Sequence, residues 1–397
     1  MAKEQYALTL TPLTGVHIGT GGELTPLDYK IASKVGDIDF KRPVYWKFSG
    51  DRILQRLGSD EKKLAAFENA SVNGNMKELQ AFFQNHCTEK SDTDYPCDIT
   101  GEFLKTYNAN KDKDPCQNAA TVLQMYHAEG TPRPVIPGTS IKGSIRTALL
   151  NHYLAGLSDN EYGRLQHDFE NMRNPEKAEE TLQKAILGYS DERNDPFRAV
   201  LVSDCSFKAS GTQLVGGLKI VKFNGHTESL EALGAPIQAE VLKGEFLGGK
   251  ASSELLITID ADLQALPSLI GKYPPKRIKA ISFQDLRNAC NDFYWSLFQE
   301  EFKKNHYGDV YDGTEETIVK LKKRLEEAAG SNNQFIIRLG RWSQVEFVTF
   351  EETFRNPRTK KDGRGKPLPW GTTRTLFDYD GRLVPMGWCV LSLKGQG

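Results

Sequence analysis

The sequence lacks long apolar runs and paired cysteines. No stretch approaches the roughly 18 to 20 apolar residues that a membrane-spanning helix needs. The first nine residues carry no basic segment followed by an apolar run, so we expect neither a membrane contact nor a secretory signal. Six cysteines occur in 397 residues without a CxxC pair. This argues against a disulfide framework and predicts a reducing, cytoplasmic location.

The chain also lacks an excess of either charge. It has 51 Lys and Arg residues against 52 Asp and Glu, which excludes a globally basic nucleic-acid binder but not a locally basic one. Aromatic residues make up 10% of the chain and supply core material, so global disorder is not expected. The length of 397 residues predicts two or three folding units.

The hydrophobic pattern predicts an α+β fold in two units. Apolar residues alternate from Tyr6 to Leu10, which is the period of a half-buried strand. Further strands are expected near 27–31, 200–207, 216–223, 237–247, 254–259, 335–339 and 383–393, with helices near 51–57, 158–196, 276–307 and 315–329. We assign 1–225 to the first unit, with a polar helical insertion at about 55–130, and 226–397 to the second, with a basic loop at 355–374.

The segment 136–150 carries the sharpest local signal. Pro137 and Gly138 predict a turn, after which Thr139 or Ser140 supplies an N-cap oxygen. The helix that follows has one apolar face, formed by Ile141, Ile145, Ala148 and Leu149. An ordinary capped amphipathic helix is one interpretation of this pattern.

A phosphate-binding helix is the other interpretation. Lys142 and Arg146 lie one turn apart, and Gly143 permits close approach to the first turn. A helix N-terminus with free N–H groups already favours anions. The order Lys142-Gly143-Ser144 is not that of a Walker loop, so ATP binding is not indicated and no cofactor is expected.

Three blocks resemble the RAMP superfamily, the RNA-binding subunits of CRISPR effector complexes: PGTSIKGSIR (137–146), LTPLTGVHIGTG (10–21) and RLGRW (338–342). Their order, with the length, is most similar to the subunit of the type III-A (Csm) complex that caps the 3′ end of the crRNA. The resemblance implies two ferredoxin-like (RRM-like) units with a helical insertion in the first. It also implies a non-catalytic role in crRNA maturation, complex assembly and antiviral defence. The implied partners are crRNA, adjacent backbone and small subunits, and a recruited host nuclease.

The resemblance and the local charge together give a set of RNA-binding candidates. The motif candidates are His17, Gly19, Gly21, Gly138, Thr139, Ser140, Lys142, Arg146, Arg338, Arg341 and Trp342. The stretch 355–374 adds seven cations against one anion, with Trp370 as an aromatic neighbour, and its candidates are Arg358, Lys360, Lys361 and Arg364. A solvated charged loop is the alternative for this stretch.

Three other groups of residues leave alternatives open. His17 is the one candidate general acid–base for a metal-independent endoribonuclease that processes crRNA, although no partner lies nearby in sequence. A zinc site could use His86, Cys87, Cys97, Cys116 and His127, but their spacings are irregular. Asp204 either binds a metal for RNA cleavage or, as the simpler interpretation, caps a turn or pairs with an arginine.

Overall fold

The computed structural model describes residues 3–209, 211–222, 231–260, 280–303, 314–355, 371 and 373–395. Two large sheets with helices packed against them form the body of the molecule, and the predicted α+β class is confirmed. The division into two ferredoxin-like units stays a prediction. No helix in the described ranges is long and apolar enough to cross a membrane.

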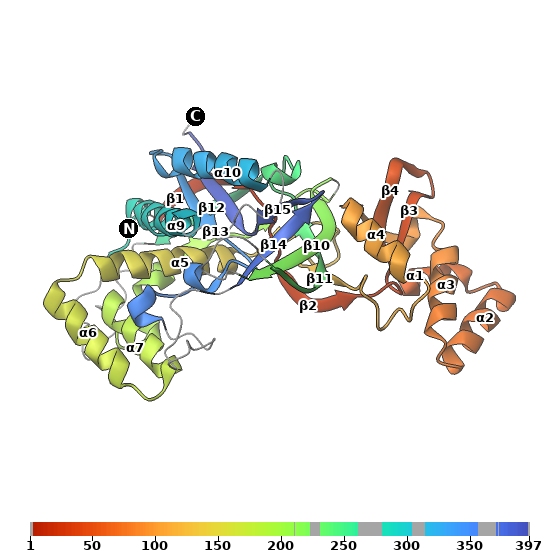
Figure 1. Cartoon of the computed structure of the whole chain (residues 1–397), viewed down its shortest axis with the longest axis horizontal. Coiled ribbons are helices and arrows are strands. Elements are labelled where there is room, and N and C mark those ends of the chain that lie inside the picture. Colours follow the sequence, from red (N-terminus) through yellow and green to blue (C-terminus); the bar gives the residue numbers. More distant parts are fainter. Residues whose placement is uncertain are drawn as a thin grey trace.

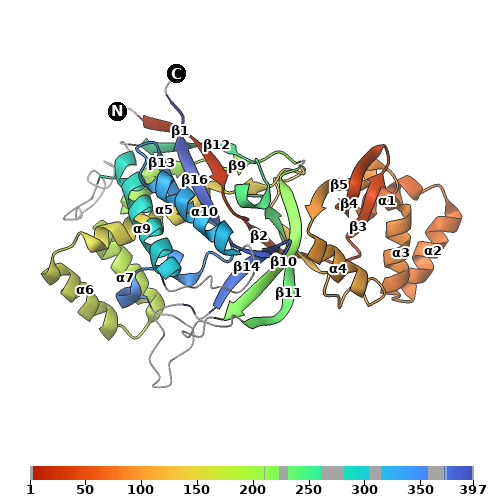
Figure 2. The same ribbon diagram turned by 45° about the horizontal axis from the view of Figure 1, so that its top comes forward.

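The first sheet has the strand order β13-β16-β1-β12-β8 and is antiparallel throughout. Its strands are β1 (Lys3–Pro12), β8 (Val200–Val202), β12 (Ser253–Asp260), β13 (Gln334–Arg338) and β16 (Trp388–Leu393). Leu8 and Leu10 alternate with more exposed neighbours and enter a core that includes residues of α5 (Gly138–Ala155) and α9 (Phe283–Lys303). This packing fixes the position of α5 (Figure 2).

The second sheet joins the body to a projecting lobe. Its main path is β2-β6-β11-β10-β5-β4-β3, and β14 pairs with both β10 and β15. The strands are β2 (Gly19–Leu24), β3 (Tyr29–Val35), β4 (Ile38–Phe48), β5 (Thr93–Ile99), β6 (Val122–Met125), β10 (Gln213–Lys222), β11 (Glu231–Leu242), β14 (Thr373–Tyr379) and β15 (Arg382–Pro385). Strand pairing in both sheets therefore crosses the proposed boundary at residue 225.

The insertion lobe comprises residues 29–110 and lies at one end of the molecule (Figure 1). It contains β3, β4 and β5 with α1 (Gly50–Leu57), α2 (Glu61–Val72), α3 (Met76–His86) and α4 (Gly101–Asn110). The sequence predicts only helices between 55 and 130, but β5 and β6 also lie there. Tyr95, Cys97 and Ile99 alternate toward a small apolar core, which is the pattern of a strand.

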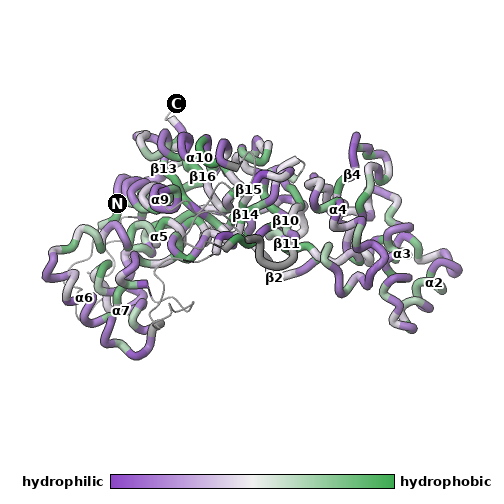
Figure 3. The backbone as a smooth tube through the Cα atoms, viewed as in Figure 1, coloured by the Kyte–Doolittle hydropathy of each residue, from purple (hydrophilic) through white to green (hydrophobic). Residues whose placement is uncertain are grey.

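A helical hairpin covers the far end of α5. It consists of α6 (Asp159–Asn171), which starts with a capping box at Ser158, and α7 (Pro175–Leu187). The sequence also predicts an apolar stripe that includes Leu157, Tyr162 and Phe169, and these side chains pack together here. Figure 3 shows hydrophilic residues interspersed with apolar ones along α2, α3, α6 and α7, as expected of amphipathic surface helices.

The remaining elements are short, apart from one helix. They are α10 (Thr314–Ala329), the strand pair β7 (Val135–Ile136) and β9 (Cys205–Ser206), and 3₁₀ turns at Lys90–Asp92, Glu192–Asn194, Pro196–Ala199, Glu245–Leu247, Val345–Phe347 and Glu352–Phe354.

Candidate nucleic-acid interface

Direct hydrogen bonds bring together the three blocks that the sequence singles out. The Arg341 amide donates to the His17 carbonyl over 2.9 Å, and Ser144 Oγ of α5 donates to the Arg338 carbonyl over 3.1 Å. The Tyr126 amide donates to the Ile18 carbonyl over 2.7 Å. Segments more than a hundred residues apart in sequence thus become neighbours in the fold.

The start of α5 differs from the prediction. The helix begins at Gly138 with Pro137 as its N-cap, so the predicted cap by Thr139 or Ser140 is wrong. Asp204 Oδ1 instead accepts a hydrogen bond of 2.7 Å from the Gly138 amide, which confirms the capping interpretation of Asp204. Because this carboxylate already satisfies one N–H group, the helix N-terminus attracts further anions less strongly.

Gly138 is buried and serves packing. A Cβ atom there would lie 2.1 Å from the Val202 carbonyl oxygen, so only glycine permits this contact. Gly143 has the opposite surroundings, because a Cβ there would meet no atom within 4 Å. Thr139 and Gly143 are exposed and Ser140 is half-buried, so the first turns of α5 present hydroxyl groups and open backbone.

Lys142 and Arg146 differ in how their charges are used. Arg146 Nη1 lies 2.8 Å from Asp195 Oδ2, and the guanidinium also donates to Gln183 and Tyr189. Lys142 is half-buried, with Nζ 5.2 Å from the centre of the Phe197 ring, and burial lowers its pKa. Arg146 is therefore neutralised within the fold, whereas Lys142 is the stronger candidate for a phosphate contact.

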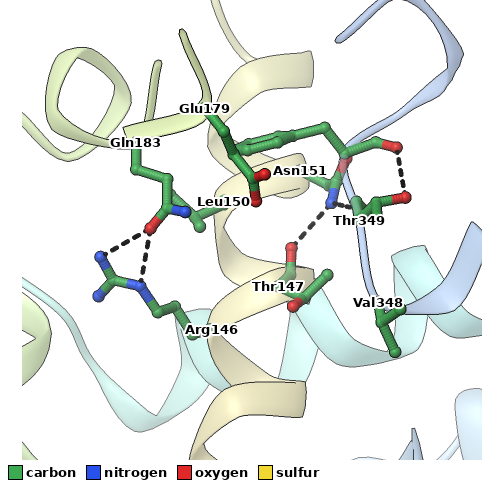
Figure 4. Close-up of a pocket in the computed structure, with 9 residues that line it drawn as sticks. Arg146, Thr147, Leu150, Asn151, Glu179, Gln183, Val348 and Thr349 are labelled. Atoms are coloured by element: carbon green, nitrogen blue, oxygen red, sulfur yellow. Dashed lines mark hydrogen bonds between the residues drawn. The ribbon is translucent and has the colours of Figure 1, made fainter. Parts of the chain in front are cut away.

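A cavity beside Arg146 is too small for a nucleotide. Its volume is about 70 Å³, which is room for a few water molecules. Figure 4 shows residues of α5, α7 and the segment 348–350 around it, and Asn151 Nδ2 donates to the carbonyls of Thr147 and Thr349. The cavity therefore lies within the packing of three elements.

The glycine segment 19–22 and the turn formed by residues 339–344 offer accessible backbone and one cation. Residues 19–22 are exposed, and Gly21 has φ +82° with no atom near its missing Cβ. Arg341 is exposed and its guanidinium carbon lies 5.3 Å from the ring centre of the half-buried Trp342. We refer to residues 339–344 as the 339–344 turn.

His17 and Arg338 point into the protein. His17 is 1% exposed, its Nδ1 lies 2.7 Å from the Glu240 carbonyl, and its ring lies 4.9 Å from that of Trp342. Burial lowers the pKa of His17, which favours the neutral imidazole. Arg338 is also 1% exposed and its guanidinium faces Glu301. Neither side chain offers surface to a ligand in this conformation.

Part of the basic stretch lies outside the described residues, including Arg358, Lys360, Lys361, Arg364 and Trp370. Its two flanking arginines are described, and both are buried. Arg355 Nε lies 3.2 Å from the Phe350 carbonyl, and Arg374 Nε lies 2.7 Å from Glu301 Oε1. Two of the seven cations counted in the sequence therefore have partners inside the fold.

The candidate zinc ligands are not brought together. Cys87 and Cys97 belong to different apolar cores, Cys116 is exposed, and His127 stacks on Tyr95. Within the described ranges, no three His, Cys, Asp or Glu side chains are grouped so that they could hold a metal ion. Burial also raises the pKa of Cys87 to about 11, which disfavours the thiolate that zinc requires.

Sequence reasoning missed two exposed residues next to these blocks. Tyr126 is 39% exposed and bridges the segments before β2 and α5, since the Val135 amide donates to its carbonyl over 3.0 Å. Arg198 is exposed, and its charge is one cause of the lowered pKa of Lys142. Neither residue belongs to a recurring pattern, so only tertiary proximity identifies it.

Comparison with known proteins gives one family. The model of the RAMP superfamily matches residues 9–366. Two curated relatives are both called "CRISPR system Cms protein Csm5". The one from Methanocaldococcus jannaschii is 25% identical over 279 residues, and the one from Streptococcus thermophilus is 27% identical over 213 residues. The matches cover 65% and 51% of this chain, and they span 62% and 56% of the relatives' own lengths.

Two solved structures share the fold. A chain of a Csm-crRNA-target RNA ternary complex of a type III-A CRISPR-Cas system has a TM-score of 0.61 and 17% identity, with 98% of this chain and 100% of that chain covered. The crystal structure of T. onnurineus Csm5 has a TM-score of 0.58 and 19% identity, with 96% and 99% covered.

Proposed function

This chain belongs to the RAMP superfamily, and we propose that it binds crRNA as a subunit of a type III-A CRISPR (Csm) complex. One observation carries the proposal. The glycine segment 19–22, the start of α5 and the 339–344 turn are held near one another in the fold by the hydrogen bonds of His17, Ser144 and Tyr126. These are the three blocks that resemble the family's RNA-binding elements.

The chemistry of this region suits an RNA backbone. Lys142, Arg198 and Arg341 are accessible cations that neutralise phosphates, and Thr139 and Ser140 add hydroxyl donors. The glycines leave room for close approach, and the rings of Tyr126 and Trp342 offer stacking surfaces. None of these contacts depends on base identity. A crRNA-binding subunit needs that property because spacer sequences vary.

The place in the complex is also part of the proposal. The Csm5 relatives and the fold shared with a Csm complex that contains crRNA and target RNA support crRNA and other Csm subunits as partners. The order of the three blocks favours the position that caps the 3′ end of the crRNA. In that position the chain would support crRNA maturation and assembly with the neighbouring backbone and small subunits.

We propose that the chain binds crRNA without cleaving it. The endoribonuclease alternative depends on His17, whose imidazole is 1% exposed and faces the Glu240 carbonyl through Nδ1. General acid–base catalysis would need this ring to reach an RNA 2′-hydroxyl or a leaving oxygen. Recruitment of a host nuclease stays a prediction of the sequence.

The test is binding of the purified chain to labelled crRNA in EDTA over a range of KCl concentrations. Phosphate-dominated binding predicts that log K falls linearly with log[salt], by about 0.7 for each contacted phosphate of a single strand. Absence of binding at low salt would contradict the proposal. A cleavage product that disappears with His17→Ala would support the enzyme instead.

A further inference from the structure

Four charged side chains from four different elements meet in the core. Glu301 lies near the C-terminus of α9, and Arg338 is the last residue of β13. Glu346 lies in the 3₁₀ turn Val345–Phe347, and Arg374 lies in β14. All four are at most 1% exposed. Glu301 lies 3.3 Å from Arg338 and 2.7 Å from Arg374, which in turn lies 3.3 Å from Glu346. We call these residues the buried charge network.

Two residues of the buried charge network flank the 339–344 turn in the sequence. Arg338 directly precedes the turn, and Glu346 follows it after one residue. Arg338 is fixed further by a 2.9 Å hydrogen bond to the Met386 carbonyl and by the rings of Phe347 and Trp388, at 4.2 and 4.9 Å. Glu346 also accepts a 2.5 Å hydrogen bond from the Gly371 amide. Both ends of the turn are thus held by buried side chains with several partners each.

The turn itself has an unfavourable backbone. Trp342 and Gln344 both have φ +69°, which side-chain-bearing residues rarely adopt, and Gly340 has φ +83°. A Cβ at Gly340 would lie 2.4 Å from the His17 carbonyl oxygen. Such conformations persist only where the surrounding structure fixes them, and they concentrate at functional sites.

We propose that Glu301 and Glu346 are positioning residues for RNA binding, which hold the strained 339–344 turn so that Arg341 and Trp342 face the RNA. This inference rests on the proposed function. Stability alone does not require such a network, because well-packed apolar residues usually replace a buried ion pair without loss. Charged pairs additionally fix the orientation of the two side chains, because the guanidinium donates its hydrogen bonds to a carboxylate in a defined geometry.

A double-mutant cycle tests the inference on the full chain. Glu346→Gln keeps the shape and one acceptor but removes the charge that faces Arg374. We expect Glu346→Gln and Arg341→Ala each to weaken crRNA binding by about tenfold. The double variant is expected to bind no more weakly than either single variant, because both changes remove the same contact.

Asp92→Asn is the matched control. Asp92 is also 1% exposed and pairs with Arg56 over 2.9 Å, but it lies in the insertion lobe. It is expected to lower the unfolding temperature and leave crRNA affinity unchanged. If Glu346→Gln does not fold, Gly340→Ala disturbs the same turn without altering a charge and should give the same loss.

The outcomes separate the two proposals. If the wild-type chain does not bind crRNA, the proposed function fails. If the wild type binds but the effects of Glu346→Gln and Arg341→Ala add, or Glu346→Gln and Gly340→Ala leave affinity unchanged, the positioning role is overturned.

Discussion

Lys142 and Arg146 lie one turn apart on α5, but the fold gives their side chains different partners. Arg146 pairs with Asp195 and donates to Gln183 and Tyr189, so removing it leaves partly buried partners without this donor. Lys142 is half-buried and makes a cation–π contact with Phe197. The same division separates the buried Arg338 from the exposed Arg341.

Arg146→Ala should therefore affect mainly stability, and Lys142→Ala mainly crRNA binding. Arg146→Ala is expected to lower the free energy of unfolding by about 1–3 kcal/mol, because the carboxylate of Asp195 loses its partner. Lys142→Ala should leave stability nearly unchanged and reduce both crRNA affinity and the salt slope. Denaturant unfolding and RNA titrations measure the two effects. Unchanged affinity in Lys142→Ala would remove this residue from the interface.

Alanine substitutions of two glycines in α5, Gly138 and Gly143, should change stability in opposite directions. Gly138→Ala forces a Cβ against the Val202 carbonyl and should destabilise the fold by about 1–3 kcal/mol. Gly143→Ala has open space and should stabilise the helix by about 0.5–1 kcal/mol. If RNA approaches the first turns closely, Gly143→Ala will nevertheless bind crRNA more weakly. Equal RNA affinity with higher stability would argue against close approach there.

At the scale of elements, the start of α5 has a structural role beside its proposed role in RNA binding. Its first amide is satisfied by Asp204, a residue from the loop between β8 and β9, and not by its own Thr139 or Ser140. The carboxylate anchors the helix, but its negative charge also stands where phosphate binding is proposed. Helix anchoring and anion binding therefore oppose each other at this position.

Asp204→Ala should consequently lower stability and raise RNA affinity. Loss of the cap is expected to cost about 1 kcal/mol of unfolding free energy. Removing the anion frees the Gly138 amide and strengthens the attraction of the helix N-terminus for phosphate. Thermal unfolding and crRNA titration at low salt measure both. A fall in affinity would place the RNA away from this helix end. Asp60→Ala, which removes the N-cap of α2 in the insertion lobe, serves as the control.

At the scale of the whole molecule, a buried carboxyl joins the insertion lobe to the body. Glu240 of β11 is fully buried and accepts hydrogen bonds from Tyr95 of β5 over 2.9 Å and from the Met125 amide over 3.0 Å. Burial raises the pKa of Glu240 to about 7, above the ordinary value of 4.5. The folded protein therefore holds a proton that the unfolded chain releases near pH 4.5.

Stability should accordingly fall as the pH rises from about 4.5 to about 7 and level off above that. The contribution of the protonated carboxyl is fully present below the unfolded pKa, and it diminishes by about 3 kcal/mol by pH 8. The test measures the free energy of unfolding of the wild type and of Glu240→Gln at several pH values between 5 and 8. The difference between the two proteins should change with pH by the contribution of the Glu240 carboxyl. The exposed Glu68→Gln is the control. A difference that does not vary with pH would contradict the assignment.

The near-zero net charge has a structural explanation. The helices α6 and α7 carry more acidic than basic side chains, while Lys142, Arg198 and Arg341 stand beside the converging blocks. Charge is therefore distributed by region, and the total does not describe any one surface. This distribution suits a chain that binds one RNA along one region and leaves other faces to protein partners.

Hydrophobic periodicity in the sequence determined the α+β class, the positions of β1, β12, α9 and α10, and the apolar stripe of α6. Local patterns sufficed there because side-chain alternation and helical spacing are properties of neighbouring residues. The resemblance also singled out three blocks that the fold brings together.

Only the tertiary structure decided which of these residues are available to a ligand. Arg146, Arg338, Arg355 and Arg374 look like surface cations in the sequence. Arg146, Arg338 and Arg374 have partners distant in the chain, and Arg355 is buried against the Phe350 carbonyl. Asp204 caps a helix that begins 66 residues before it, and two backbone hydrogen bonds bring Tyr126 next to the blocks of the proposed interface. The free energy of a charge depends on burial and on its partners. Both are set by contacts between distant segments, which no local pattern contains.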